Sequence, residues 1–179
     1  MTVTKIKKSR SIMERKNRVK MKGTPLTLLG PELKIGDIAP DFKVIDITLQ
    51  KVSLKEFKGK KIFINVVPSI DTGVCSIQTK RFSEEASKIK DVTFLTISTD
   101  LPFAQKRFCE TEKIEGMKML CDSVWHDFGM KYGVLIKDIG LLARSIFIID
   151  SDGKISYIQI VDELTNHPDY EAVLRELKK

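Results

Sequence analysis

Residues 60–90 read KKIFINVVPSIDTGVCSIQTKRFSEEASKIK, and this stretch decides the fold. Residues 60–67 give a basic start and then a continuous, β-branched apolar run, which is typical of a strand buried on both faces. Pro68 ends that strand, and Asp71 or Thr72 can cap a following helix. The apolar stripe expected on that helix consists of Val74, Ile77, Phe82, Ala86 and Ile89. The stretch therefore predicts a buried strand, a tight turn and a helix.

The same alternation continues toward the C-terminus. Residues 92–99 predict a second buried strand, and residues 102–113 a shorter helix with Pro102 in its first turn. Further on we expect a strand at 118–121, a short helix at 124–133, strands at 145–150 and 154–161, and a closing helix from residue 169. Ser151-Asp152-Gly153 between the last two strands is a hairpin signal.

The chain before residue 60 adds shorter elements. Residues 18–29 alternate around Gly23 and predict a β-hairpin, and residues 42–47 and 51–54 predict two short strands. Strands that alternate with helices and end in an antiparallel hairpin predict an α/β protein with a mixed central sheet flanked by helices. With its N-terminal hairpin added, this is the thioredoxin-like architecture.

Size and composition favour one globular domain. The chain has 179 residues, of which 42% are hydrophobic and 31% charged. No apolar run approaches the roughly 20 residues that span a bilayer, so we expect no membrane partner.

The net charge of +7 is concentrated at the N-terminus. Of the 31 basic and 24 acidic residues, nine and one fall in residues 1–22, which leaves 22 and 23 for the rest. We therefore expect residues 1–17 to be a basic, flexible extension and residues 18–179 to be the folded domain. Such a tail can bind anions, but no base-reading motif accompanies it, so we expect no nucleic-acid partner. It also lacks the apolar segment of a secretion signal, and we expect a cytoplasmic protein.

The cysteines are Cys75, Cys109 and Cys121, an odd and sparse set that does not suit a disulfide framework. Only two histidines are present, and no Cys-x-x-Cys motif occurs, so we expect neither a zinc site nor a cofactor.

Cys75 stands in the first turn of the predicted helix. Unpaired N–H groups and the helix dipole stabilise an anion there, and the thiolate is the reactive form of cysteine. The alternative without a catalytic role is that Cys75 is a buried cysteine on the inner face of the helix. Position alone leaves both interpretations open.

Several separated motifs extend the argument. PSIDTGVC (residues 68–75) resembles the active-site segment of peroxiredoxins, in which Pro, three residues, Thr or Ser, two residues and Cys follow one another. GDIAPDF (36–42) resembles the opening motif of that superfamily. Three further motifs resemble those of the bacterial thiol peroxidase subfamily, whose members are atypical two-cysteine peroxiredoxins. They are QTKRF (78–82), DLPFAQKRFC (100–109) and GLLARS (140–145). The resemblance covers roughly residues 18–179.

The resemblance implies a role for each matching residue. Cys75 would be the peroxidatic cysteine, Pro68 would shield its thiolate, and Thr72 would hydrogen-bond the thiolate and the peroxide. Arg144 would supply a fixed positive charge and several donors to the same atoms. The residues alone also allow a simpler interpretation, in which Arg144 is a solvated charge before a strand.

The same resemblance assigns Cys109 as the resolving cysteine. Peroxide would oxidise Cys75 to a sulfenic acid, Cys109 would condense with it to an intrachain disulfide, and thioredoxin or a similar dithiol would reduce that bond. The two Cα atoms must approach within about 7 Å for this, so we expect local unwinding around both cysteines. The alternative for Cys109 is a core residue beside Phe108. Cys121 in KMLC is expected to be a buried strand residue without a role.

The resemblance thus implies a hydroperoxide-reducing enzyme that forms homodimers. The competing hypothesis is a redox sensor or holdase with the same fold, in which the cysteines report oxidation to a partner. The complete set of Pro68, Thr72, Cys75 and Arg144 favours catalysis. We expect Phe103, Phe108 and Phe128 in the core, with Phe103 also able to border an apolar substrate pocket.

Overall fold

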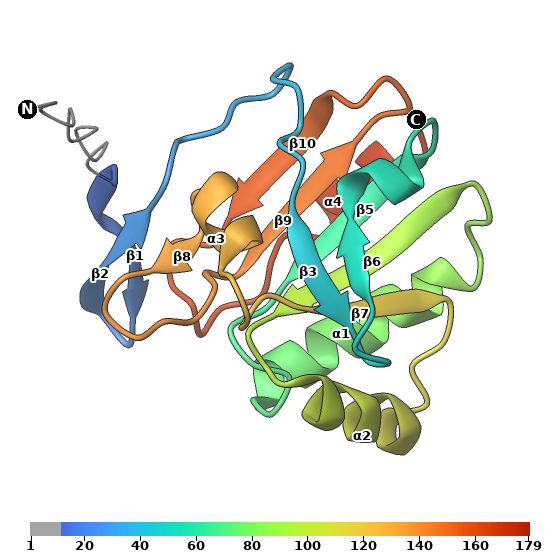
Figure 1. Ribbon diagram of the computed structural model, residues 1–179, viewed down its shortest axis with the longest axis horizontal. Helices are drawn as coiled ribbons and strands as arrows, with labels where there is room; N and C mark the ends of the chain where they lie inside the picture. Colours follow the sequence, from blue (N-terminus) through green and yellow to red (C-terminus); the bar gives the residue numbers. More distant parts are fainter. Residues whose placement is uncertain (1–11) are drawn as a thin grey trace, which may run out of the picture.

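The computed structural model describes residues 12–179, and its centre is a seven-stranded sheet with the order β10-β9-β5-β6-β7-β3-β4 (Figure 1). β5, β6 and β7 run parallel, whereas the other pairs are antiparallel, so the predicted mixed sheet is confirmed. The strands are β3 (Lys43–Asp46), β4 (Lys51–Ser53), β5 (Lys61–Val66), β6 (Val92–Ser98), β7 (Met117–Cys121), β9 (Ser145–Ile149) and β10 (Ile155–Ile160).

Helices cover both faces of this sheet. They are α1 (Gly73–Ala86), α2 (Pro102–Glu112), α3 (Asp127–Lys131) and α4 (Tyr170–Leu177), with a 3-10 helix at Leu54–Phe57. On one face, Phe63 and Phe94 of the sheet pack with Phe82 of α1 and Val173 of α4. The opposite face carries Ile64 and Ile97, together with side chains from α3 and from the N-terminal hairpin. The predicted thioredoxin-like layering is therefore present.

The smaller sheet joins β1 (Glu14–Met21), β2 (Thr24–Leu29) and β8 (Leu135–Ile136), and it lies at one end of the molecule (Figure 1). β1 begins four residues before the expected hairpin boundary at residue 18. Its register shifts between Arg15 and Val19, and Asn17 has a φ of 56°, so a bulge interrupts the alternation that sequence patterns rely on. Residues 1–11 of the expected basic extension lie outside the described residues.

The helix expected at 124–133 is shorter than predicted. α3 starts only at Asp127, because His126 adopts a left-handed conformation with φ 49° and ψ 27°. Such a residue cannot continue a right-handed helix.

The apolar stripe predicted for α1 is wrong at Ile77, whose side chain is 56% exposed, although Phe82 and Ala86 are buried. Polar Gln78 and Thr79 are fully buried instead. Both contact Asn65 of β5: the Gln78 amide donates to its carbonyl oxygen at 2.5 Å, and the Asn65 amide lies 3.3 Å from the Thr79 hydroxyl. These hydrogen bonds compensate the burial of polar groups that the hydrophobic pattern placed outside.

Within residues 12–179, no helix is both long and apolar enough to cross a membrane.

A loop that follows β10 fastens the N-terminal hairpin to the domain. Lys22 and Gly23 form the hairpin turn with φ values of 49° and 79°, and their N–H groups donate to the two carboxylate oxygens of Glu163 at 2.9 and 3.0 Å. The Thr165 hydroxyl also donates to this carboxylate, at 2.8 Å. The Gly23 N–H and the Thr165 hydroxyl stabilise the anion most and lower the pKa of Glu163 from 4.5 to about 2.

Two variants of α1 test its corrected packing. Phe82 is fully buried, with its ring centroid 4.6 Å from that of Phe63, so Phe82→Ala should cost about 3–4 kcal/mol of unfolding free energy. Ile77→Ala should change it by less than about 0.5 kcal/mol, since the side chain faces solvent. Urea unfolding followed by circular dichroism measures both. Equal losses in the two variants would contradict the corrected face.

Replacement of Glu163 by Gln should remove a contribution to the unfolding free energy that is present at neutral pH and lost in acid. Because the folded-state pKa lies below that of the unfolded chain, the contribution is complete above pH 4.5 and is lost as the pH falls toward 2. Urea titrations at several pH values should therefore show the largest difference between wild type and variant near neutral pH, and a shrinking difference in acid. A difference that stays constant over this range would contradict the assignment.

Candidate active site

The loop between β5 and α1 is fixed by a carboxylate from the neighbouring strand. Asp100, just after β6, accepts the Ser69 hydroxyl at 2.7 Å and the Ile70 N–H at 2.8 Å. Pro68 is buried in the same loop. Because β5 and β6 are parallel, their carboxyl ends meet at one edge of the sheet, and this contact holds the start of α1 there.

Cys75 is the third residue of α1, and its side chain is fully buried. The Thr72 hydroxyl lies 2.7 Å from its sulfur. Thr72 occupies the N-cap position with extended backbone angles, yet its hydroxyl makes no capping bond to the helix. The hydroxyl is closest to the sulfur and lies farther, at 3.3 Å, from the Ser69 carbonyl oxygen. The first N–H groups of the helix, which have no intrahelical partners, add positive potential around the sulfur.

Arg144 brings a buried guanidinium to the same sulfur. The residue is only 2% exposed, and its Nη2 lies 3.4 Å from Cys75 Sγ although 69 positions separate the two in the chain. Strand pairing explains the approach, because Val66 at the end of β5 is opposite Ser145 at the start of β9. The residue before β9 thus lies beside the loop that leads to Cys75. The reading of Arg144 as a solvated charge is wrong.

Two further groups hold this guanidinium, and sequence reasoning missed both. Gln78 Oε1 accepts from Nη1 at 2.6 Å, and the Leu164 carbonyl accepts from Nε at 3.0 Å and Nη2 at 2.9 Å. Gln78 follows Cys75 by three residues, a spacing that places both on one side of a helix and could have indicated it. A backbone carbonyl such as that of Leu164 carries no sequence signal.

Cys109 lies in α2, half-buried, and belongs to the apolar cluster that contains Cys75, Met119 and Phe108. All three cysteines are free thiols. Burial, reinforced by the Glu110 carboxylate, raises the pKa of the Cys109 thiol above its usual value. The structure therefore brings Cys109 to the Cys75 cluster without bonding them.

Cys121 ends β7 and is fully buried, with its sulfur 3.0 Å from the Ser123 hydroxyl. The site described above makes no use of it.

A hollow of about 390 Å³ opens between α1 and α2. Thr72, the N-cap of α1, and Ser76 of α1 line it on one side, and Arg107 and Phe108 of α2 line it on the other. Thr72 therefore both lines the hollow and contacts the Cys75 sulfur, although Cys75 itself is buried and does not line the hollow.

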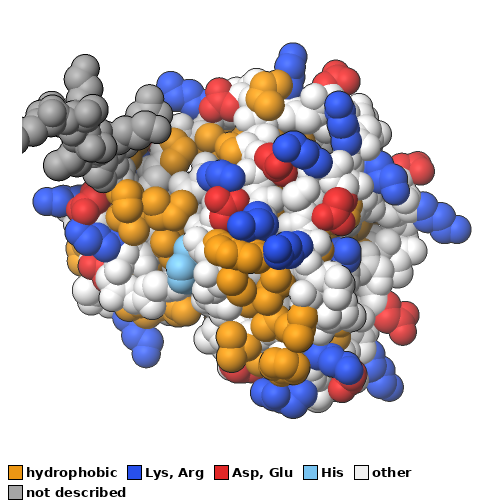
Figure 2. Space-filling model, viewed as in Figure 1, with side chains coloured by type: hydrophobic (Ala, Val, Ile, Leu, Met, Phe, Trp, Pro, Cys, Tyr) orange, Lys and Arg blue, Asp and Glu red, His pale blue; other side chains and the backbone are white. Residues whose placement is uncertain are grey.

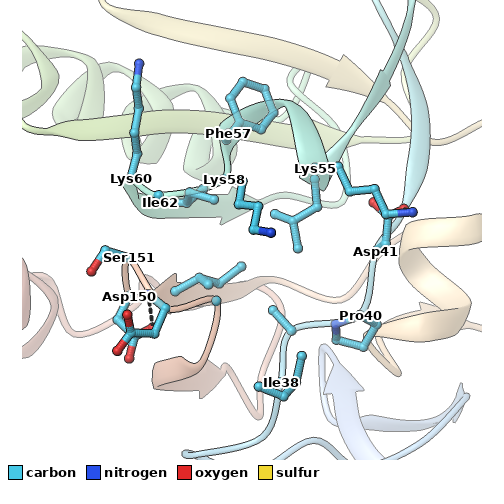
Figure 3. Close-up of a pocket in the computed structure, with 16 residues that line it drawn as sticks. Ile38, Pro40, Asp41, Lys55, Phe57, Lys58, Lys60, Ile62, Asp150 and Ser151 are labelled. Atoms are coloured by element: carbon cyan, nitrogen blue, oxygen red, sulfur yellow. Dashed lines mark hydrogen bonds and ion pairs between the residues drawn. The ribbon is translucent and has the colours of Figure 1, made fainter.

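A larger hollow of about 480 Å³ lies elsewhere, between the 3-10 helix and the β9–β10 turn (Figure 3). Ile62 and Ile149, which line it, pair at the amino-terminal end of β5, whereas Cys75 follows the opposite end. None of the predicted site residues lines this hollow.

Between residues 12 and 179, no group of three or more His, Cys, Asp or Glu side chains is placed to hold an ion.

Comparisons with known proteins agree with the geometry. The redoxin family profile matches residues 34–174. Thiol peroxidases of Oceanobacillus iheyensis and Bacillus subtilis are 52% and 50% identical, over 91% and 89% of this chain and 99% and 96% of theirs. A solved structure of a peroxiredoxin-like protein from Aquifex aeolicus has a TM-score of 0.85 and 44% identity, and covers 91% of this chain and 97% of its own. The chain therefore belongs to the redoxin family and, within it, to the thiol peroxidases.

Proposed function

We propose that Cys75 is the peroxidatic cysteine of this thiol-dependent peroxidase. The observation that carries the proposal is the pair of donors on one buried sulfur, the Thr72 hydroxyl at 2.7 Å and Arg144 Nη2 at 3.4 Å. Donors aimed at a sulfur in the first turn of a helix stabilise the thiolate, which is the nucleophile. The thiolate attacks one oxygen of the hydroperoxide. The O–O bond breaks, the alcohol or water leaves with a proton, and Cys75 becomes a sulfenic acid.

Thr72 and Arg144 serve this step in different ways. The hydroxyl can donate to the thiolate and accept from the peroxide O–H, so Thr72 would orient the substrate. The guanidinium stays charged and offers five donors, so Arg144 would stabilise the negative charge that moves from sulfur to the leaving oxygen. Pro68, buried in the loop that leads to Cys75, would keep water from the thiolate. The hollow beside Thr72 would admit hydrogen peroxide or an organic hydroperoxide.

We propose Cys109 as the resolving residue. Its place in the apolar cluster of Cys75 supports this. The Cys109 thiol would attack the Cys75 sulfenic acid, forming an intrachain disulfide and releasing water. The two cysteines lie within separate helices, so the first turn of α1 and the end of α2 would unwind.

Thioredoxin or a similar dithiol would reduce the disulfide by exchange. Because such dithiols are kept reduced in the cytoplasm, we place the enzyme there.

Cysteine variants test both roles in one assay, the oxidation of NADPH by thioredoxin reductase, thioredoxin and cumene hydroperoxide. Cys75→Ser should have no activity. Cys109→Ser should consume about one equivalent of peroxide, leave a sulfenic acid that dimedone traps, and fail to recycle. Cys121→Ser is the matched control and should keep wild-type turnover. Full activity in Cys75→Ser would overturn the proposal and favour the redox sensor or holdase.

We propose that the enzyme forms a homodimer through an apolar surface beside this site. Contrary to expectation, Phe103 is 62% exposed, and Leu101, Val124 and Trp125 are also exposed. Leu101 and Phe103 lie at the start of α2, which follows β6, and Val124 and Trp125 lie in the loop after β7. Because β6 and β7 are adjacent parallel strands, these side chains lie at one edge of the sheet. Figure 2 shows hydrophobic side chains gathered on this face over the ends of those strands. A patch of exposed aromatic and aliphatic residues is typical of a protein–protein contact.

A charge placed in this surface should separate the two copies. Phe103→Lys should elute as a monomer in size-exclusion chromatography with light scattering, while wild type elutes as a dimer. Ile35→Lys, at a side chain that is 66% exposed in the connector, is the control and should remain dimeric. A wild-type monomer, or a dimeric Phe103→Lys, would contradict the proposed interface.

A further inference from the structure

A short segment after β10 contacts both the N-terminal hairpin and the active-site arginine. On one side, the Leu164 carbonyl accepts two hydrogen bonds from Arg144. On the other side, the Leu164 N–H donates to the Lys20 carbonyl of β1 at 2.8 Å, and the Lys20 N–H donates to the Asp162 carbonyl at 2.6 Å. Leu164 itself is 2% exposed and belongs to the main core. The peptide that holds the guanidinium is therefore held in turn by the hairpin.

Glu163 makes the most specific part of this contact. Its two carboxylate oxygens accept the N–H groups of Lys22 and Gly23, the two residues of the hairpin turn. A turn with two positive φ angles presents these N–H groups side by side, which suits a bidentate carboxylate. The Thr165 N–H and hydroxyl bind the same carboxylate from the other side. Four donors, two from the turn and two from Thr165, thus fix the residue directly before Leu164.

We propose that Glu163 is a positioning residue for the peroxidase reaction, which locks the Leu164 carbonyl between the N-terminal hairpin and Arg144 and thereby aims the guanidinium at the Cys75 sulfur. The proposal rests on the role proposed above for Arg144. Glu163 touches neither the sulfur nor the guanidinium, so it acts through the peptide that follows it. The hairpin, which contributes no side chain to the site, gains a function as the anchor of that peptide.

Geometry explains why this support matters for rate. Two of the four hydrogen bonds that Arg144 makes with its side chain go to the single Leu164 oxygen, and the contact to sulfur is the longest of the set at 3.4 Å. A shift of the Leu164 carbonyl would rotate the planar guanidinium about Gln78 and lengthen that contact. Electrostatic stabilisation of a thiolate and of a transition state falls steeply with such displacements.

The test compares Glu163→Ala with Asp162→Ala. Both remove one exposed negative charge beside the hairpin, but the Asp162 carboxylate contacts Arg18 on the strand and leaves the turn N–H groups untouched. Stopped-flow mixing with hydrogen peroxide gives the second-order rate constant of Cys75 oxidation. We expect a loss of about tenfold in Glu163→Ala and less than about twofold in Asp162→Ala. Glu163→Gln keeps one acceptor oxygen and should fall between wild type and Glu163→Ala.

A second readout separates positioning from simple destabilisation. In a Cys109→Ser background, the pH profile of Cys75 alkylation by iodoacetamide reports how well the thiolate is stabilised. Its midpoint should move to higher pH in Glu163→Ala and stay in place in Asp162→Ala. A merely structural role of Glu163 would lower the melting temperature without moving this midpoint, and that result would overturn the proposal.

Arg144→Gln distinguishes failure of this inference from failure of the proposed function. If Arg144→Gln is slow and Glu163→Ala reacts like Asp162→Ala, Glu163 has no positioning role and the proposed chemistry stands. If Arg144→Gln keeps the wild-type rate constant, the role proposed for Arg144 fails, and the inference fails with it.

Discussion

The burial of the Arg144 guanidinium is the constraint on which the rest of the site depends. A cation taken out of water is costly unless its donors are satisfied and a negative charge lies near it. Its donors meet the Leu164 carbonyl, Gln78 and the Cys75 sulfur. Among the ion pairs of the described residues, none joins Arg144 to a carboxylate. Under the proposed function, the thiolate of Cys75 would supply the anion that complements this charge.

Satisfying the guanidinium shapes the surrounding elements. In α1, Gln78 and Thr79 point inward and Ile77 is exposed, because the Gln78 amide contacts Arg144 and Asn65 and the Thr79 hydroxyl contacts Asn65. Asn65 in turn donates to Thr96 of β6 at 3.1 Å. A polar network therefore runs from the sulfur into the middle of the sheet. Such a network is fixed in place because each member would be unpaired if it moved.

Local patterns predicted much of the fold. The apolar runs at β5 and β6, the proline at the start of α2 and the Ser-Asp-Gly turn before β10 each act over a few residues, so sequence revealed them. The helix and strand bounds that the sequence did not predict have identifiable physical causes. A bulge hid the start of β1, a left-handed His126 shortened α3, and the two-residue strand β8 is too short to form a pattern.

The sequence by itself determined that Cys75 lies in the first turn of a helix after a buried strand, with Thr72 three residues before it, since these relations are local. Family motifs in the sequence added Pro68, Cys109 and Arg144, without a physical reason for their proximity. Only the tertiary structure decided that Arg144 is buried against the sulfur, that Gln78 and Leu164 hold it, and that Asp100 and Glu163 anchor the adjoining loops. The physical reason is that these contacts join distant segments through strand register and through backbone groups, which every residue possesses and no sequence pattern marks.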